Sequence, residues 1–549
     1  MNCPRDFSPI QINLLTRRVL LAFLVLLSPV MTAEGQVFVN RKISGVTPAF
    51  GDIGRPESFN FSRVHFSPDS HYVVFMGDRE TDEQIELYSA RLSGGDPIKL
   101  NAALVNGGNV ESFKISDDSQ YVVYRADQNQ DEVFELFSVP IQGGTQVRLN
   151  DDLVPGGNVA NYEVTPNGLG VVYRADQSQD EVWELFSNWI TGGNPVQLNP
   201  ALDIDRDVEY FTITPNSLGV VYRVGADSSD GDLYSVLITG VGGPIQLSPT
   251  RTSDWQSVSS YKISSDSQTV VFVGEFENEN DLELYRVPVI GGTSTKIDGT
   301  SVEDTNYYTI VGISADGTRV VYRAEQDFAG RREFYSVPMA GGTVIKLNAP
   351  LVPGRWLCCW SFRGGSVLLY SGDQDFEEVD ELFAASIYTG SRVKLNDPLV
   401  SGGNVIDFEL TKNELGVVYI ADQDQDDVIE IYSVPITGGP SIDLNPTLVS
   451  GGDVGAFRLA QNNLGVVYRA DQDTDEVFEL YLVNIFGGPS HKLNGTLTAG
   501  GNVDSSGIKI SDDNRAVVYI ADQDINEKFE LYLTTEEELV FSDGFESGL

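Results

Sequence analysis

A motif of two apolar residues followed by an aromatic one recurs along the chain at a nearly constant interval of about 49 residues. Ten copies cover residues 55–535, with no linker between any two. A repeat of this length indicates one supersecondary unit that packs on its own copies. This excludes the three or four separate domains that a length of 549 residues alone would suggest. The repeat aromatic residues are Phe75, Tyr124, Tyr173, Tyr222, Phe272, Tyr322, Tyr370, Tyr419, Tyr468 and Tyr519.

Each repeat has the pattern of four short β-strands, as residues 113–150 illustrate. Residues rich in Val, Ile, Tyr and Phe alternate with polar ones over 113–116, 121–125, 133–139 and 145–149, and Asp, Ser and Gly turns separate these runs. No stretch has the apolar spacing of an amphipathic helix. The sequence therefore predicts an all-β fold, a β-propeller of ten four-stranded repeats.

The two ends of the repeat region complement each other. Unit ten supplies strands through Tyr532 but lacks the fourth one, whereas residues 37–44 resemble that missing strand and precede unit one. We expect residues 36–54 to contain a strand that closes the ring and covers both sheet edges. The even spacing favours a single ten-bladed ring, with two five-bladed rings as the alternative.

The repeat resembles that of the TolB-like propellers, a WD-like repeat family. The matching residues are Ser67-Pro68-Asp69, Val73-Val74-Phe75, Leu87-Tyr88, Gly94-Gly95 and Lys99-Leu100. The resemblance covers about residues 55–535 and implies the propeller fold. It implies no single activity, because such propellers occur in envelope complexes, in peptidases and in other proteins.

The N-terminus has the pattern of a secretory signal. Arg17 and Arg18 precede an apolar run over residues 19–30, and small and polar residues follow over 32–35. Residues 16–20 also loosely resemble a twin-arginine signal, but the apolar run fits ordinary secretion better. We expect residues 1–35 to be removed and the protein to be periplasmic, on the cell surface or secreted, without membrane insertion after cleavage. The tail, residues 536–549, resembles a short ending of exported bacterial proteins.

Charge and cysteine content limit the partners. Asp and Glu number 80 against 36 Lys and Arg, which gives a formal net charge of −44. Such a surface argues against nucleic acid and anionic membranes, and favours cations. Beyond the signal only Cys358 and Cys359 remain, which is no disulfide framework. Two buried thiols are the favoured interpretation, and a vicinal disulfide is the alternative.

An acidic loop follows the second strand in most repeats. Carboxylates or amides stand at +3, +5, +7 and +8 from the repeat aromatic, and alternating oxygen ligands of this kind can converge on Ca²⁺. The match to an EF-hand is partial, and the alternative is a solvated turn. The candidate calcium ligands are Asp127, Asn129, Asp131, Asp176, Asp180, Asp373, Asp375, Asp422, Asp424, Asp426, Asp471, Asp473, Asp475, Asp522 and Asp524.

Two further features accompany these loops. A Gly-Gly-Asn/Asp-Val loop precedes units two, three, eight, nine and ten, all of which carry the acidic loop, so we expect the two loops to form one local structure. An Arg at +1, as in Arg125, is expected to pair with the Glu at +11, here Glu135, across the hairpin.

The innermost strand of each blade carries one varied position that should lie near the centre of the ring. Its mixed charges predict ordinary packing and solvation rather than a converging site. The residues are His65, Lys114, Glu163, Thr212, Lys262, Gly312, Cys359, Glu409, Arg458 and Lys509.

Residues typical of catalysis are scarce. Three histidines occur in different settings, and the sequence contains neither a Gly-x-Ser-x-Gly elbow nor a phosphate-binding Gly loop. We therefore predict an exported, non-enzymatic binding or scaffold propeller that engages a protein or glycan through one face, with Ca²⁺ as the one cofactor to test. The alternative is a glycan lyase or hydrolase. A pocket that joins Glu163, Glu409 and a cation would favour the enzyme.

Overall fold

The computed structural model describes residues 38–45, 63–226, 230–298 and 307–536. The predicted signal, residues 1–35, lies outside the described residues, as does the tail beyond Glu536. Residues 40–535 form one unit, and the description below concerns this unit. Only the bounds of β1 and β40 extend past it, by two residues and by one residue. The described residues form forty β-strands and contain no helix, and hence none that could span a membrane.

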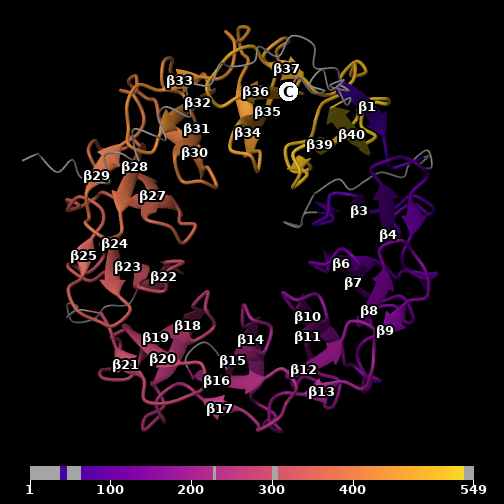
Figure 1. Cartoon of the computed structure of the whole chain (residues 1–549), viewed down its shortest axis with the longest axis vertical. Coiled ribbons are helices and arrows are strands. Elements are labelled where there is room, and N and C mark those ends of the chain that lie inside the picture. Colours follow the sequence, from indigo (N-terminus) through magenta and orange to yellow (C-terminus); the bar gives the residue numbers. More distant parts are fainter. Residues whose placement is uncertain (1–37, 46–62, 227–229, 299–306, 537–549) are drawn as a thin grey trace, which may run out of the picture. The chain divides into compact units, whose positions relative to one another are not determined.

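The strands form ten antiparallel sheets of four, which follow one another around a ring in chain order (Figure 1). Blades one to five are β2 (Val64–Phe66), β3 (Tyr72–Gly77), β4 (Glu86–Arg91), β5 (Ile98–Lys99); β6 (Val110–Ile115), β7 (Tyr121–Ala126), β8 (Glu135–Pro140), β9 (Val147–Arg148); β10 (Val159–Val164), β11 (Gly170–Ala175), β12 (Glu184–Trp189), β13 (Val196–Gln197); β14 (Asp207–Ile213), β15 (Gly219–Gly225), β16 (Asp232–Leu237), β17 (Ile245–Gln246); and β18 (Ser257–Ile263), β19 (Thr269–Glu275), β20 (Glu283–Pro288), β21 (Thr295–Lys296).

Blades six to ten continue this order, and the tenth takes its outermost strand from the start of the chain. They are β22 (Tyr308–Ile313), β23 (Arg319–Ala324), β24 (Glu333–Pro338), β25 (Ile345–Lys346); β26 (Leu357–Ser361), β27 (Val367–Gly372), β28 (Glu381–Ser386), β29 (Arg392–Lys394); β30 (Val405–Leu410), β31 (Gly416–Ala421), β32 (Glu430–Pro435), β33 (Ile442–Asp443); β34 (Val454–Leu459), β35 (Gly465–Ala470), β36 (Glu479–Asn484), β37 (His491–Lys492); and β38 (Lys509–Ile510), β39 (Ala516–Ala521), β40 (Glu530–Glu536), β1 (Phe38–Lys42).

The repeat aromatic residue forms a buried ring pair inside its blade. Tyr124 on β7 is in register with Phe137 on β8, and their rings stack with centroids 5.3 Å apart. All ten blades contain the equivalent stacked pair. Each such pair adds about 0.5–1.5 kcal/mol beyond the area that it buries. The flanking valines, Val122 and Val123, are fully buried and pack in the hydrophobic clusters between neighbouring blades.

The Glu at +11 is paired differently from the sequence prediction, which is wrong on this point. In the hairpin of blade two, Glu135 is in register with Ala126, and Arg125 with Leu136. Because successive residues of a strand point to opposite faces, Arg125 and Glu135 lie on different faces of the sheet. Glu135 instead accepts a hydrogen bond from Arg148 of the fourth strand, at 2.9 Å.

A fourth-strand cation is the usual partner of this buried Glu. A lysine forms the ion pair in six blades. The pairs are Lys99–Glu86, Lys296–Glu283, Lys346–Glu333, Lys394–Glu381, Lys492–Glu479 and Lys42–Glu530.

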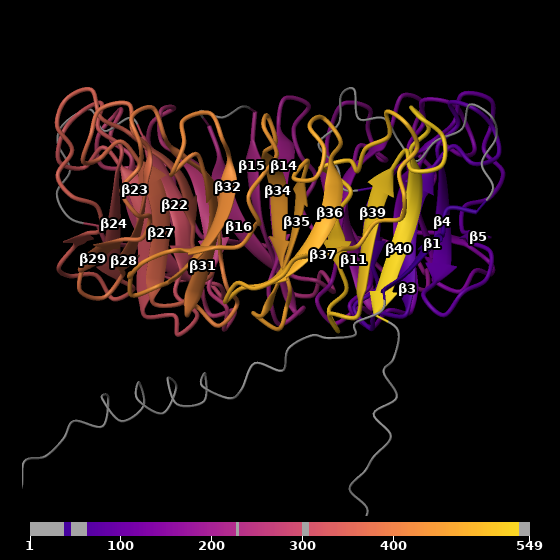
Figure 2. The ribbon, with the colours of Figure 1, turned by 90° about the horizontal axis from the view of Figure 1, so that it is seen from above.

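The ring closes as the sequence predicts, so the alternative of two five-bladed rings is wrong (Figures 1 and 2). The Asn40 amide donates hydrogen bonds to the Tyr519 hydroxyl at 2.5 Å and to the Thr534 hydroxyl at 2.8 Å. Ile43 lies in one hydrophobic cluster with residues of blades one and ten. The turns between first and second strands also join these blades, because the Asp513 N–H donates to Ser70 Oγ at 3.3 Å.

Deletion of residues 36–45 should destabilise the ring, because it exposes the edge of β40. We expect a lower melting temperature by calorimetry and a tendency to associate. A peptide of residues 36–45 added in trans should restore the melting temperature, and the same peptide with Asn40→Ala and Lys42→Ala should restore less. An unchanged melting temperature after the deletion would contradict this account of closure.

Asp298, which is half-buried, departs from the repeat at a position after the fourth strand that is buried in the blades that carry Asn there. Seven other blades have Asn at this position. The side-chain oxygen of each Asn accepts a hydrogen bond from a backbone N–H near the start of the third strand, as Asn101 Oδ1 does from Leu87 N–H at 2.8 Å. Asp298 Oδ2 accepts from Leu284 N–H at 3.2 Å, but its buried Oδ1 has no hydrogen-bond partner. Burial raises the pKa of Asp298 to about 7 from 3.8.

Stability should therefore depend on the titration of Asp298. Because the folded pKa lies above the unfolded one, the folded state binds the extra proton between these two values, and the free energy of unfolding falls as pH rises towards about 7. The loss should reach up to roughly 4 kcal/mol. Asp298→Asn should remove this part of the pH dependence in urea unfolding and be the more stable protein above pH 7. Parallel pH profiles of the two proteins would contradict it.

Candidate functional site

The +3 Asp of the acidic loop is buried, and its carboxylate accepts hydrogen bonds from the backbone of two loops. In blade two, Asp127 Oδ1 accepts from Asn109 N–H at 2.5 Å, and Oδ2 accepts from Glu132 N–H at 3.1 Å. Glu132 has φ of 61°, and the carboxylate holds the loop in this left-handed conformation. The same two acceptor roles recur at Asp176, Asp471 and Asp522. Asp422 and Asp373 each show the first of the two contacts.

The +7 residue packs against the Gly-Gly loop. Gly107 has φ of 90°, and a Cβ added there would lie 2.7 Å from Asp131 Oδ1, so this contact requires glycine. Asp180, Asp426 and Asp475 stand in the same way against Gly156, Gly402 and Gly451. The two loops thus form one local structure, as their co-occurrence predicts.

This loop pair also joins neighbouring blades. Asn109 Oδ1 accepts from Ile85 N–H of the preceding blade at 2.7 Å, while its own N–H is held by Asp127. Asn158, Asp207, Asn404, Asp453 and Asn502 repeat the contact to the preceding blade.

The +5 residues differ in their contacts, and two of them pair with lysines of the fourth strand. Asp473 pairs with Lys492 at 3.0 Å and Asp524 with Lys42 at 3.5 Å, whereas Asn129 donates to Glu135 at 2.6 Å. Asp375 and Asp424 form no ion pair within the described part of the chain.

The carboxylates of one loop therefore serve separate structural contacts. Among the described residues no group of three or more His, Cys, Asp or Glu side chains is arranged to hold a metal ion. Calcium binding by these loops stays a prediction.

A structural role of the +3 Asp and a role in calcium binding predict different stabilities in EDTA. Asp127→Ala leaves two backbone N–H groups without their acceptor and should cost about 2 kcal/mol of unfolding free energy even in EDTA. Asp375→Ala, at an exposed +5 position, should cost almost nothing. If Ca²⁺ coordination were the main role of the loop, the wild-type protein and Asp127→Ala would unfold alike in EDTA at matched ionic strength.

The inner wall is formed by the first strand of each blade, and nine of its ten predicted residues occupy the expected register position. Cys359 is the exception, and the prediction is wrong there: Ser361, opposite Leu369, holds that position. The turn after this strand is one residue shorter in blade seven, which shifts the register relative to the repeat aromatic Tyr370. Cys359 lies in the β-bulge instead.

Two ion pairs lie on this wall, between neighbouring blades. Lys114 and Glu163 are 2.5 Å apart (Nζ to Oε2), and Arg363 and Glu409 are 2.7 Å apart (Nη2 to Oε1). Burial raises the pKa of Glu409, against the opposing charges of Arg363 and Arg458. Glu163 lies in blade three and Glu409 in blade eight, on opposite sides of the ring (Figure 1), so the two carboxylates do not converge.

The two cysteines are exposed free thiols, which corrects the prediction that they are buried. The sulfur atoms of Cys358 and Cys359 are 2.9 Å apart. The contact with Cys359, together with partial burial, raises the pKa of Cys358 to about 11.

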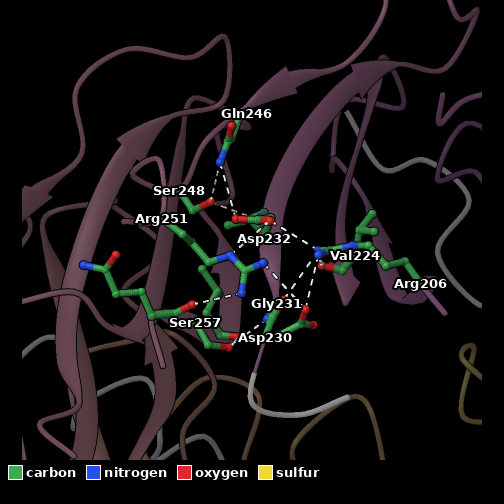
Figure 3. A network of polar contacts seen from close by, with 12 residues as sticks. Arg206, Val224, Asp230, Gly231, Asp232, Gln246, Ser248, Arg251 and Ser257 are labelled. Atoms are coloured by element: carbon green, nitrogen blue, oxygen red, sulfur yellow. Dashed lines mark hydrogen bonds and ion pairs between the residues drawn. The ribbon is translucent and has the colours of Figure 1, made fainter. Parts of the chain in front are cut away.

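Blade four replaces the lysine and glutamate pair with a larger network that the sequence analysis missed (Figure 3). Arg206 contacts Asp230 at 3.2 Å and Asp232 at 3.3 Å, and Arg251 approaches the same two carboxylates at 3.6 and 3.5 Å. The fourth strand has Gln246 where six other blades have lysine, and arginines from the two flanking connections supply the positive charge. This network is structural.

An exposed apolar surface on the loops of blades six and seven was also missed. We call Phe328, Val352, Trp356 and Phe376 the aromatic patch; they are 52%, 54%, 54% and 60% exposed. Phe328 and Phe376 both stand at +6 of the acidic loop, where Gln or Thr occurs in five other blades. That comparison within the repeat is the signal that could have found the patch.

Arginines connect the loops that carry the aromatic patch. Arg331 stacks over Phe328, with its guanidinium carbon 4.3 Å from the ring centroid, and donates to the Leu351 carbonyl at 2.8 Å. Arg355 donates to the Asp373 carbonyl at 3.1 Å, and Trp356 N–H to Asp373 Oδ1 at 2.6 Å. The three loops are therefore held together by direct contacts.

No family model matches the chain, and no curated protein matches it either. The TolB-like assignment accordingly stays a prediction. Solved structures of similar fold include an oligogalacturonate lyase in complex with manganese, with 14% identity, a TM-score of 0.35 and coverage of 78% of this chain and 97% of that one. Dipeptidyl peptidase 4 of Porphyromonas gingivalis has 10% identity, a TM-score of 0.46 and coverage of 75% and 65%. Similarity at this level says nothing about what this chain binds or catalyses.

Proposed function

We propose that this chain is an exported, non-enzymatic binding propeller, and that a protein or glycan docks on the aromatic patch. The observation that carries the proposal is the exposure of three large aromatic side chains, Phe328, Trp356 and Phe376, on neighbouring loops. Large aromatic side chains that stay exposed on neighbouring loops are typical of interaction sites. The flat rings can pack against apolar side chains or against the C–H face of a sugar.

The neighbouring arginine adds to this argument. Trp and Arg are the residue types that most often carry binding energy at interfaces. Arg331 is stacked on Phe328 and anchored to a backbone carbonyl, so it loses little freedom on binding. This part of the patch thus presents a restrained side chain to a partner.

The positions of the inner carboxylates favour this role over a glycan lyase or hydrolase. Such an enzyme needs an acid or base and a charge-neutralising cation at one substrate bond. Glu163 and Glu409 lie on opposite sides of the ring, and each is paired with a cation of the preceding blade. These contacts are the ones expected of a solvated wall.

The test compares two exposed tryptophans on opposite ends of the blades. Trp356 lies on the loop that joins blades six and seven, whereas Trp189, 62% exposed, ends the third strand of blade three on the other face. Wild-type protein, Trp356→Ala and Trp189→Ala would be screened on a glycan array and a displayed peptide library. We expect ligands whose affinity falls at least about tenfold with Trp356→Ala and stays unchanged with Trp189→Ala.

The melting temperature of each variant serves as the folding control. Ligands that bind Trp356→Ala as well as the wild-type protein, or equal losses in both variants, would contradict docking on the patch.

A further inference from the structure

Two cations lie in equivalent positions on neighbouring strands of the inner wall. Arg458 on β34 is opposite Val467, and Lys509 on β38 is opposite Val518, so both occupy the same register position in blades nine and ten. Both side chains are half-buried.

Two other cations next to this wall are neutralised by direct partners, but Arg458 and Lys509 are not. Lys114 is paired with Glu163 and Arg363 with Glu409. Within the described ranges, neither Arg458 nor Lys509 forms an ion pair. Arg458 Nη1 donates to the carbonyl of Phe457 at 2.6 Å, which leaves other guanidinium donors available.

The electrostatic environment shows that the two charges act on each other. Burial, followed by the charge of Arg458, lowers the pKa of Lys509. Glu409 is near enough to Arg458 to feel its charge, but Glu409 Oε1 is held by Arg363. In a chain with 80 carboxylates and 36 basic residues, two neighbouring cations without a carboxylate of their own are unusual.

We propose that Arg458 and Lys509 together bind an oxyanion, the carboxylate, sulfate or phosphate group of a ligand. An oxyanion placed between them removes their mutual repulsion and replaces the water lost on burial. The guanidinium supplies a two-pronged set of N–H donors and the ammonium a third, which suits a group with two or three oxygen atoms. This site lies on the innermost strands and goes beyond the proposed binding through the loop face.

The test is calorimetric titration of the purified protein with sodium sulfate, sodium phosphate, sodium glucuronate and glucose, at fixed pH and ionic strength. The three oxyanions should give saturable binding, and neutral glucose should not. Arg458→Gln and Lys509→Gln should each weaken oxyanion binding at least about tenfold. Binding of sulfate or phosphate alone identifies an inorganic oxyanion, and binding of glucuronate as well identifies a carboxylate-bearing sugar; both outcomes support the site.

Lys262 provides the matched control. It occupies the same register position on β18, but its neighbours on the wall are Thr212 and Gly312, which carry no charge. Lys262→Gln should leave oxyanion binding unchanged. Arg458→Lys keeps the positive charge but lacks the paired N–H donors of the guanidinium, so it should bind oxyanions with intermediate affinity. This variant keeps the proposal testable even if Arg458→Gln does not fold.

Two results would overturn the proposal. One is the absence of oxyanion binding by the folded wild-type protein. The other is an equal loss in Lys262→Gln and in the Arg458 and Lys509 variants, which would indicate general screening rather than a site. Failure of docking on the aromatic patch would leave these measurements unaffected, because Trp356→Ala does not alter the inner wall.

Discussion

The structure depends on every blade having a neighbour on both sides. The hydrophobic clusters lie between adjacent sheets rather than within one, so a blade buries its Val-Val-Tyr strand only when the next blade covers it. In a ring this requirement is met everywhere if the first and last blades meet. The cluster that joins Ile43 and Val64 to Val518 and Leu533 shows that they do. The polar contacts between blades, such as that of Asn109 with Ile85, fix the angle at which neighbours pack.

Much of this arrangement was predictable because it follows from period and pattern. The spacing of the repeat aromatic residues gave the number of blades, and the missing fourth strand of unit ten indicated its partner. Side-chain pairing was harder. The Arg125–Glu135 prediction failed because it requires the hairpin register, and a shift of one residue reverses the face on which a side chain lies. Cys359 was misplaced for two reasons. It stands eleven residues before Tyr370, whereas the other nine positions stand ten before their repeat aromatic residue, and the turn of blade seven is one residue shorter.

The acidic loops show that one residue pattern is compatible with two different roles. Asp127 and its equivalents are buried acceptors for backbone N–H groups, a role that a sequence cannot distinguish from metal ligation, because both require Asp at fixed spacing. The aromatic patch was missed for the opposite reason. A single Phe at a loop tip, such as Phe376, is unremarkable until the fold places a second one in the neighbouring blade. Sequence reasoning therefore identified the loop face but not the part of it best suited to contact a partner.

The contact between Asn40 and Tyr519 spans 479 residues, and this separation determines the order of folding events. Hairpins within a blade join residues close in sequence and can form as the chain emerges, whereas the outer strand of blade ten is synthesised first and finds its sheet last. The entropy of closing so long a loop grows only slowly with length, but the search is slow compared with local hairpin formation. Until the final blade is complete, the ring is open, and the first and last blades do not cover each other. In this open state the uncovered edge of blade ten can pair with another molecule, so slow completion of the final blade favours association between chains.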